Sequence, residues 1–288
     1  MSSPTSTVQV VDVHKRFGRT TALAGVSLGL CSGVTGLAGP NGAGKTTLLQ
    51  LLATVTIPHS GWLRLLGYDP ADGDQRTEIR RRLGYLPQEL RFHLDFTAFE
   101  FVDYVAILKE HSDRRARHRE VRRVLEAVDL ATVAGKKIRT LAFGMRKRVA
   151  MAQVLLGDPR LVLLDEPISG LDPEQRLHWR DLISKLSEDR TIVVASHQIE
   201  HMSWLCDRLI LMSAGTIKWD GTPRQLANVA RGKVWLADQP QAGAWRSWRT
   251  GDGYRHVGDP PVGVEPIEPT IEDGYLLLLS ENSNHAVA

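Results

Sequence analysis

The 288-residue sequence lacks the hallmarks of secreted, metal-binding and membrane-spanning proteins. Its only two cysteines, Cys31 and Cys206, lie far apart and show no metal-ligand spacing, so we expect no disulfide framework and no cysteine metal site. No stretch approaches the roughly 18 consecutive apolar residues of a transmembrane helix. The N-terminus lacks the basic and apolar regions of a signal peptide. These absences predict a cytosolic chain that reaches a membrane only through a partner.

An excess of one charge is also absent. Lys and Arg number 36 against 33 Asp and Glu, a net charge of +3 that is too small to indicate a polyanionic partner. The Arg-rich stretch 114–123 could contact nucleic acid or lipid headgroups, but its helical spacing favours a solvated helix face. We therefore predict no nucleic-acid partner. With 42% hydrophobic and 24% charged residues, the chain should form a packed core.

What is present is a pattern of short apolar strands interrupted by one helical region. A helix is predicted directly after the strand at 33–39, and residues from about 95 to 157 have helical spacing with no good strand. Another helix is expected between the strands at 161–165 and 191–195. The predicted strands are 8–14, 21–30, 33–39, 61–67, 82–88, 161–165, 191–195 and 208–212. Buried strands alternating with helices indicate a parallel α/β sheet.

The last sixty residues differ in composition. They are rich in Gly and Pro, with strand-like pieces at 233–236 and 274–279. We predict a main domain over residues 1–230, whose helical subdomain covers about 95–157. A small β-rich accessory domain would follow at 231–280, and a disordered tail at 281–288.

A phosphate-binding loop is the strongest motif. The stretch "GPNGAGKTT" fits G-x-x-x-x-G-K-[ST] and lies between a predicted strand and a predicted helix, which makes a chance Gly-rich turn the weaker alternative. Its glycines let backbone N–H groups converge on phosphates, aided by the helix dipole. Lys45 adds a charge toward the β- and γ-phosphates, Thr46 a hydroxyl for Mg²⁺, and Thr47 a further phosphate contact. The predicted nucleotide-binding residues are Gly39, Pro40, Asn41, Gly42, Ala43, Gly44, Lys45, Thr46 and Thr47.

Two apolar strands end in groups suited to phosphate chemistry. "LVLLDEP" (161–167) ends in two carboxylates, which are costly to bury without a partner. Asp165 can hold Mg²⁺ through water, and Glu166 can activate the attacking water; a strand end that reaches solvent is the alternative. "IVVASHQ" (192–198) ends at His197, for which we favour a γ-phosphate contact over a purely structural role.

With these pieces in order, residues 8–225 resemble the ATP-binding subunit of an ABC transporter. The shared motifs are the phosphate loop, the strand acids, "GYLPQE", "ISGLDP" and "SHQIEH", all in family order. The resemblance implies that Phe17 stacks on adenine. It implies that Gln88 contributes to the Mg²⁺ site and links it to the membrane partner, and that Asp172 lies at the interface between two such subunits.

The stretch "TLAFGMRKR" (140–148) falls where this family has its signature, commonly L-S-G-G-Q. The resemblance implies that these residues close over the γ-phosphate bound to a second subunit. The residues concerned are Leu141, Ala142, Phe143, Gly144 and Met145. Phe143 and Met145 resemble the x-S-x-G-M variant of drug- and bacitracin-type exporters. Ala142 lacks the expected serine hydroxyl. Because a hydrogen bond to a charged group contributes ~1.5–3 kcal/mol, slow ATP turnover is our hypothesis.

The resemblance also sets expectations for architecture and partners. It implies an ATPase core with a mixed sheet, an antiparallel β subdomain and an inserted helical subdomain. ATP and Mg²⁺ would be the ligands, and the partners a separate polytopic permease and a second ATP-binding subunit, identical or different. The chain would then lie at the cytoplasmic face of the membrane and power export of a drug, antibiotic or similar small molecule. The alternatives are an ATP-gated protein without a transport role and a regulatory subunit with low turnover.

Overall fold

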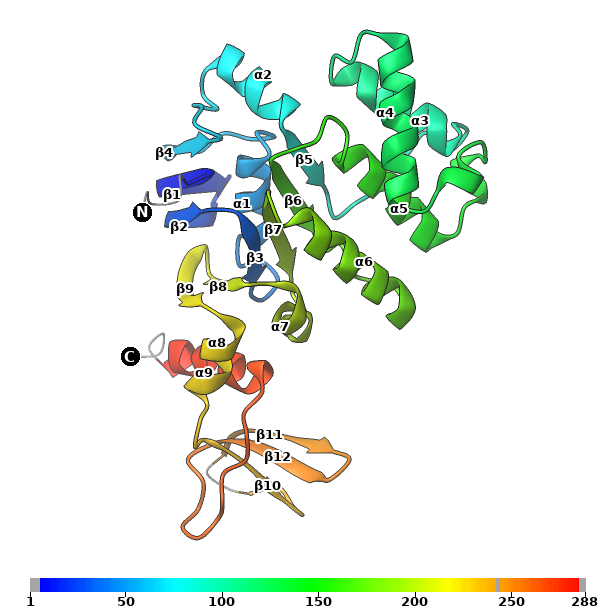
Figure 1. Ribbon diagram of the computed structural model, residues 1–288. Coiled ribbons are helices and arrows are strands. Elements are labelled where there is room, and N and C mark those ends of the chain that lie inside the picture. Colours follow the sequence, from blue (N-terminus) through cyan, green and yellow to red (C-terminus); the bar gives the residue numbers. More distant parts are fainter. Residues whose placement is uncertain (1–5, 242–243, 285–288) are drawn as a thin grey trace. The chain divides into compact units, whose positions relative to one another are not determined.

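The computed structural model describes residues 6–241 and 244–284 (Figure 1). They form two compact units. The first contains the chain to His197 and also residues 210–219; the second contains residues 198–209 and the chain from Asp220 onward. The predicted division at 230/231 remains a prediction, and each unit is described by itself below.

A six-stranded sheet organises the first unit, with strand order β5-β6-β7-β3-β8-β9. Its strands are β3 (Gly33–Ala38), β5 (Leu83–Leu86), β6 (Leu161–Asp165), β7 (Thr191–Ser196), β8 (Arg208–Ser213) and β9 (Thr216–Gly221). The pairs β5–β6, β6–β7 and β3–β7 are parallel. The register sets Ala38 opposite Ser196 and Asp165 opposite Ala195. The carboxyl ends of β3, β6 and β7 therefore meet at one edge, where polar residues follow each strand.

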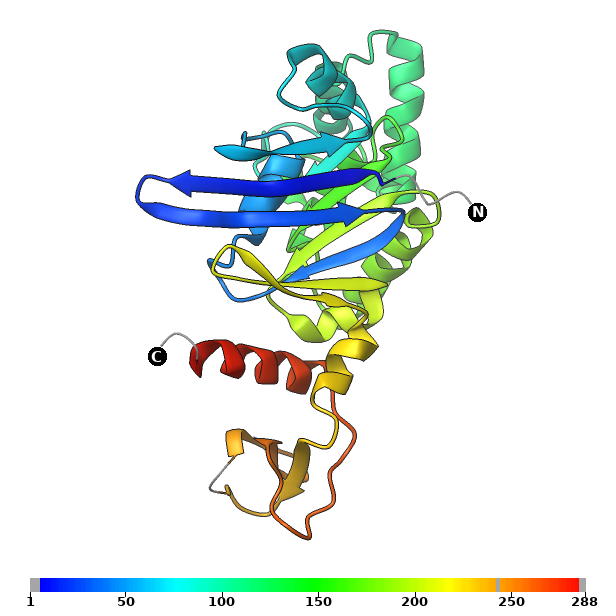
Figure 2. The same ribbon diagram turned by 90° about the vertical axis from the view of Figure 1, so that its left-hand side faces the viewer.

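A separate antiparallel sheet has the order β2-β1-β4. Figure 2 shows β1 (Val8–Phe17) and β2 (Thr20–Leu30) as a long hairpin, which β4 (Ser60–Leu65) joins. Alternating side chains of these strands are buried, as expected for a sheet with one face on a core. The mixed sheet and the antiparallel sheet confirm the predicted fold class.

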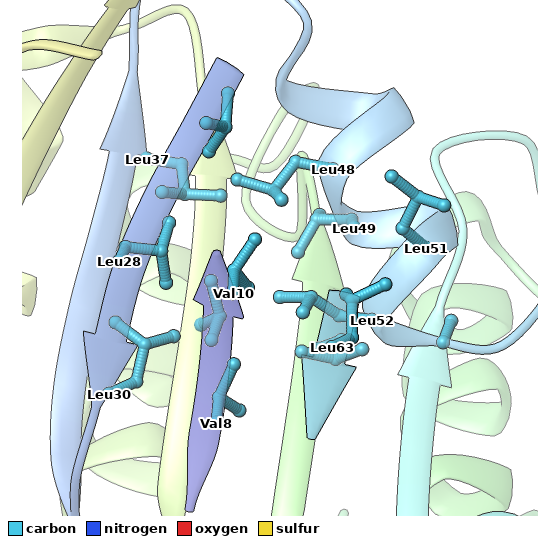
Figure 3. Close-up of a cluster of buried hydrophobic side chains, with 14 of the residues drawn as sticks. Val8, Val10, Leu28, Leu30, Leu37, Leu48, Leu49, Leu51, Leu52 and Leu63 are labelled. Atoms are coloured by element: carbon cyan, nitrogen blue, oxygen red, sulfur yellow. The ribbon is translucent and has the colours of Figure 1, made fainter. Parts of the chain in front are cut away.

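One hydrophobic cluster joins the two sheets through α1 (Lys45–Leu52) (Figure 3). Four leucines of α1 are buried, so the helix is apolar on most of its circumference. They pack with residues of β1, β2, β3 and β4, labelled in the figure as Val8, Val10, Leu28, Leu30, Leu37 and Leu63. The helix that begins in the phosphate loop is thus fixed in the core.

Helices occupy the region predicted to be helical. They are α3 (Ala98–Leu108), α4 (Arg114–Ala127) and α5 (Phe143–Val154), with short 3-10 turns at Ala131–Val133 and Ile138–Thr140. Thr97 and Glu100 form a capping box at α3, and Asp113 caps α4. The basic stretch 114–123 lies on α4, with a largely exposed surface, and Arg117 pairs with Asp103 at 2.7 Å.

Two helices flank the strands of the first unit. α6 (Pro173–Leu186) is the helix predicted between two strands, and Asp172 caps it. α2 (Gly73–Arg81) was not predicted, because its sequence is polar and only Ile79 is buried. Asp72 caps α2 by accepting hydrogen bonds from the backbone N–H groups of Asp74 and Gln75. This capping residue, the acid in the first turn and the arginines in the last turn were the sequence signals for the helix.

The second unit combines a three-stranded antiparallel sheet with helices. The sheet has the order β10-β12-β11, from β10 (Val234–Ala237), β11 (Ala244–Thr250) and β12 (Gly253–Gly258). The helices are α7 (Met202–Leu205), α8 (Pro223–Val229) and α9 (Ile271–Asn284), and a 3-10 turn spans Ile199–His201. A small core of Ala230, Val234, Val257 and Leu277 holds the sheet and α9 together.

The prediction of a strand-like piece at 274–279 is wrong, because this stretch lies in the middle of α9. The contacts of Asp273 favour a helix over a strand here. Its carboxylate accepts hydrogen bonds from the N–H and hydroxyl of Thr270 and pairs with Arg255. These contacts start a helix that the run of leucines alone did not indicate. The predicted tail 281–288 overlaps α9 up to Asn284, and 285–288 lie outside the described residues.

Replacing Gly274 with alanine should destabilise the second unit. An added Cβ would lie 1.9 Å from the carbonyl oxygen of Leu226 in α8, so the two helices would have to separate. Overpacking of this kind costs about 1–3 kcal/mol, which outweighs the helix preference of alanine. Thermal unfolding followed by tryptophan fluorescence should show a lower midpoint for Gly274→Ala. Gly251→Ala is the control, because nothing lies within 4 Å of its added Cβ; equal midpoints for the two variants would contradict the packing argument.

Candidate nucleotide site

The phosphate loop is held between two other strands of the first unit. Gly39 has φ 149°, and a Cβ there would lie 2.1 Å from the carbonyl oxygen of Met212 in β8. Gly44 has φ 102°, and its Cβ would lie 2.5 Å from the carbonyl oxygen of Ala22 in β2. Only glycine fits at either position, because both the conformation and the space exclude a side chain. The loop therefore keeps one shape between β3 and α1.

Lys45 folds back over this loop from the first turn of α1. Its Nζ donates hydrogen bonds to the carbonyl oxygens of Gly39 at 2.7 Å and Pro40 at 3.0 Å. The side chain is buried, and burial lowers the pKa of the ammonium, while the charges of Glu166 and Asp165 oppose this shift. The ammonium thus lies among the backbone groups that the motif predicts to hold phosphates.

Asp165 ends β6 beside the phosphate loop. It is 2% exposed, and its Oδ2 is buried without a hydrogen-bond partner among the described residues. Burial raises the pKa of this carboxyl, while a side-chain hydrogen bond with Thr46 acts in the opposite direction. A cleft of about 450 Å³ is lined by both residues and by Gln88, which follows β5. The structure thus brings the three predicted metal ligands to one cleft.

These three side chains fit Mg²⁺. They offer a carboxylate, a hydroxyl and an amide oxygen, and Mg²⁺ prefers such oxygen ligands. The unpartnered Oδ2 of Asp165 is the observation that calls for a cation, since an unpaired carboxylate oxygen is costly to bury. Among the described residues no group of three or more His, Cys, Asp and Glu could hold a metal by itself.

Glu166 and His197 lie together where β6 and β7 end. Glu166 Oε1 accepts a hydrogen bond from the backbone N–H of His197 at 2.8 Å and lies 2.6 Å from His197 Nδ1. Its Oε2 accepts a hydrogen bond from the hydroxyl of Ser196 at 3.1 Å. Glu166 adopts the left-handed conformation, with φ 50°, which is unfavourable for a residue with a side chain. The chain thus fixes the carboxylate of Glu166 on both oxygens.

The predicted signature residues begin α5. Ala142 occupies the N-cap position and provides no side-chain hydrogen bond. Phe143 and Met145 are 50% and 40% exposed, whereas Leu141 is buried. Gly144 is also buried, and a Cβ there would lie 2.4 Å from Oε1 of Gln175. These five residues do not line the cleft of Asp165, so the structure leaves them apart from it.

Phe17 and Asp172 are the remaining predicted residues. Phe17 ends β1 with half of its side chain exposed, and Lys15 Nζ lies 5.3 Å from the centroid of its ring. Asp172 is exposed, and its carboxylate accepts a hydrogen bond from the N–H of Gln175 as the cap of α6. An exposed aromatic ring remains available to stack on a base, and an exposed carboxylate remains available to a partner.

Comparison with known proteins identifies the family. A family model described as ABC transporter matches residues 23–169. The chain belongs to the ABC transporter family. Similar sequences align with this ABC protein over most of its length. It is 39% identical over 287 residues to an uncharacterized ABC transporter ATP-binding protein of Synechocystis, covering 91% of this chain and 80% of that protein. It is 36% identical over 229 residues to the Nod factor export ATP-binding protein I of Burkholderia lata, covering 77% and 73%.

Solved ABC structures share the fold. A dimeric ATP-binding cassette in a post-hydrolysis state bound to ADP and Pi matches with a TM-score of 0.68 at 27% identity, covering 75% of this chain and 98% of that chain. The protein is therefore an ABC-type ATPase subunit, as the sequence predicted. Within residues 6–241 and 244–284, no helix of this ABC protein is both long and apolar enough to cross a bilayer.

Two residues that contact Glu166, Ser196 and Lys147, were not predicted from the sequence. Ser196 directly precedes His197 at the end of an apolar strand, and its hydroxyl binds Glu166. Lys147 is buried on α5 and donates hydrogen bonds to backbone carbonyls just after β6. The available signal for Lys147 was its spacing from Gly144, three residues earlier on the same helix face.

Proposed function

We propose that this ABC protein hydrolyses ATP at the described cleft and powers a separate polytopic membrane permease that exports a drug, antibiotic or similar small molecule. The main support for ATP hydrolysis at this cleft is that Lys45, Asp165 and Glu166 lie close together at one edge of the sheet. Similarity to the Nod factor export protein and to a probable multidrug ABC transporter ATP-binding protein of Escherichia coli supports the export direction.

The roles of the residues follow from their positions. The backbone N–H groups of residues 41–47 and the ammonium of Lys45 would bind the phosphates. Thr47 would add a hydroxyl contact, and Phe17 would stack on adenine. Glu166 would accept a proton from the water that attacks the γ-phosphorus. The bond from that phosphorus to the bridging oxygen then breaks and ADP leaves. His197, fixed by Glu166, would contact the γ-phosphate and hold the carboxylate in place.

Thr46, Asp165 and Gln88 would hold Mg²⁺. When bound, the ion neutralises part of the charge on the phosphate oxygens. Gln88 also has a position suited to signalling, because it lines the cleft next to Glu89, Leu90, Arg91 and Phe92 on the segment that leads toward α3. We propose that the permease acts on the cation site through this segment.

We further propose that two ATP-binding subunits, identical or different, enclose two nucleotides. Two of the similar solved cassettes are described as dimeric. In this arrangement Leu141, Ala142, Phe143, Gly144 and Met145 would face the nucleotide of the other subunit, and Asp172 would lie at the interface. The exposure of Phe143 and Met145 supports this role, because large apolar side chains gain most from cover by a partner. The protein would then act at the cytoplasmic face of the membrane.

Two measurements test the proposal. The purified chain should bind ATP and release phosphate in the presence of Mg²⁺, and little phosphate should appear when EDTA is added. Tagged protein should also co-purify with a polytopic membrane protein from its own cells. Absence of Mg²⁺-dependent hydrolysis, both alone and with that membrane protein, would contradict the ATPase. Active protein that associates with no membrane protein would favour an ATP-gated role outside transport.

A regulatory subunit with low turnover is the second candidate, favoured by Ala142. Without a hydroxyl at the N-cap of α5, two functions of the usual serine are absent: capping the helix and contacting the partner's nucleotide. The backbone N–H groups at the start of α5 remain available to an anion. We therefore propose slow hydrolysis rather than none.

Ala142→Ser should raise both stability and hydrolysis. A serine at the N-cap can accept a hydrogen bond from the N–H of Gly144 or Met145, which stabilises a helix by about 0.5–2 kcal/mol. The same hydroxyl would strengthen closure over the γ-phosphate. Single-turnover hydrolysis and thermal unfolding should both be measured. Ala131→Ser, in the exposed 3-10 turn after α4, is the control for a hydroxyl added elsewhere. An unchanged hydrolysis rate in Ala142→Ser would contradict the hypothesis of slow turnover.

A further inference from the structure

The ammonium of Lys147 binds the backbone that carries Glu166. From the second turn of α5, Nζ donates hydrogen bonds to the carbonyl oxygens of Glu166 at 3.3 Å, Pro167 at 3.0 Å and Ser169. The side chain is 7% exposed. Three converging carbonyls match the three donors of an ammonium, so one side chain satisfies three backbone acceptors within residues 166–169.

This backbone is held in an unfavourable conformation. Glu166 has φ 50°, a left-handed conformation that costs roughly 1–2 kcal/mol for a residue with a side chain. Such a conformation persists only where surrounding contacts enforce it. Burial lowers the pKa of Lys147 to about 8, and the charge of Glu166 opposes this shift. At neutral pH the ammonium is therefore largely protonated and has all three donors.

The same lysine connects this backbone to the start of α5. Its Nζ lies 5.5 Å from the centroid of the Phe143 ring, within range of a cation–π contact. A Cβ on Gly170 would lie 3.2 Å from Cε1 of Phe143, so the ring also packs close to the segment after Ser169. The first two turns of α5 and residues 166–170 therefore form one packed group.

We propose that Lys147 is a positioning residue for Glu166 and links this glutamate to the signature turn of the same subunit. The inference rests on the proposed ATP hydrolysis and on the proposed dimer. Glu166 would act on the ATP of its own chain, while Phe143 and Gly144 would face the ATP of the partner. When residues 141–145 move against the partner's nucleotide, α5 and its Lys147 would move with them. The ammonium would then shift the backbone of Glu166, to which it is hydrogen-bonded. Lys147 itself would contact neither ATP nor the attacking water.

Substitution of Lys147 should separate hydrolysis from binding. Lys147→Met removes the donors, so Glu166 loses its fixed position. Because misplacement by about 1 Å can cost up to 100-fold, we expect kcat for ATP to fall about tenfold or more while the Kd for ATP stays unchanged. Lys147→Arg retains the charge and several donors and should recover part of the rate, because a planar guanidinium cannot reproduce all three contacts of the ammonium. The rate is expressed per ATP-binding site, so that loss of folded protein does not count as loss of catalysis.

Lys109 provides a matched control. Its Nζ also donates to two backbone carbonyls, those of Leu83 at 3.0 Å and Leu156 at 2.9 Å, and burial likewise lowers its pKa to about 8. It contacts neither Glu166 nor residues 167–170 by these bonds. Lys109→Met should change stability while leaving kcat per site near the wild-type value. If Lys147→Met does not fold, Lys147→Gln serves in the same comparison, because its amide has only two donors and no charge.

A double substitution gives the decisive readout. If Lys147 acts through the carboxylate of Glu166, Lys147→Met should add no further loss of single-turnover rate in a Glu166→Gln background. A full additional loss there, or wild-type kcat in Lys147→Met, would overturn the proposal. Failure of the wild-type chain to bind or hydrolyse ATP would instead contradict the proposed function, so the two failures are distinguishable.

Discussion

Glu166→Gln is expected to retain ATP and to lower its hydrolysis about a thousandfold, within the range found for loss of a general base. The amide has nearly the shape of the carboxylate, so its oxygen can still accept the hydrogen bond from the N–H of His197 while its NH₂ group donates to the hydroxyl oxygen of Ser196. It cannot accept the proton of the attacking water. Binding should therefore persist, because Lys45 and the phosphate loop are untouched.

This expectation is tested with two measurements on the same protein. Equilibrium binding of ATP gives Kd, and single-turnover release of phosphate gives the rate of hydrolysis. Glu188→Gln, an exposed acid after α6, is the matched control and should behave like the wild type. Substantial turnover in Glu166→Gln would remove this residue from the role of base. A large loss of ATP binding would show that its carboxylate supports the loop rather than the chemistry.

Lys45→Ala is expected to weaken ATP binding about 10- to 100-fold, the effect of losing a hydrogen bond from a charged donor worth ~1.5–3 kcal/mol. In the structure the Lys45 ammonium donates to the carbonyl oxygens of Gly39 and Pro40, within the loop that would receive the phosphates. Removing it takes away a positive charge that would attract the phosphates and that interacts with the carboxylates of Asp165 and Glu166. The negative charges of the carboxylates and of the phosphates would then repel one another in one cleft.

Binding of a non-hydrolysable ATP analogue by calorimetry would measure this loss. Lys109→Met again serves as the control, since it also removes an ammonium that donates to two backbone carbonyl oxygens, but outside the phosphate loop. Both variants should unfold at similar temperatures without nucleotide. Equal affinities of Lys45→Ala and the wild type would contradict the assignment of the loop to phosphates.

Glu166→Gln and Lys45→Ala should also differ in how far ATP raises their unfolding temperature. A nucleotide that binds only the folded protein raises its unfolding temperature by an amount that grows with the ratio of nucleotide concentration to Kd. Excess ATP should therefore protect Glu166→Gln against heat and protect Lys45→Ala much less. The contrast separates loss of binding from loss of chemistry in one experiment.

Prediction from the sequence succeeded where local pattern and tertiary environment agreed. The glycines of the phosphate loop occupy backbone shapes and spaces that admit no side chain, so their spacing was informative. The apolar runs of β3, β6 and β7 are buried along almost their whole length, which accounts for the few polar residues within them. Helix α2 was missed because a polar surface helix with one buried residue has almost no hydrophobic period.

Long-range contacts explain the other failures. The leucine run of α9 fits a strand as well as a helix, and the contacts of Asp273 with Thr270 and Arg255, together with the close approach of Gly274 to α8, favour the helix. Lys147 was overlooked because a lysine within "RKR" suggests a solvated surface. Its burial depends on carbonyls that come from residues 166–169, about twenty positions further along the chain.

The sequence by itself determined the family and the fold class, and it yielded predictions for the nucleotide, the cation and the glutamate of the site. It could do so because phosphate binding requires particular residues at fixed local spacing. The tertiary structure decided what spacing cannot reveal. Strand register brings Glu166 to His197, and folding places the Lys147 ammonium against the backbone of Glu166. Burial leaves one oxygen of Asp165 without a hydrogen-bond partner in the part of the chain that the structure describes. These features depend on segments that meet only when the sheet forms, because hydrogen bonding and desolvation act across space rather than along the chain.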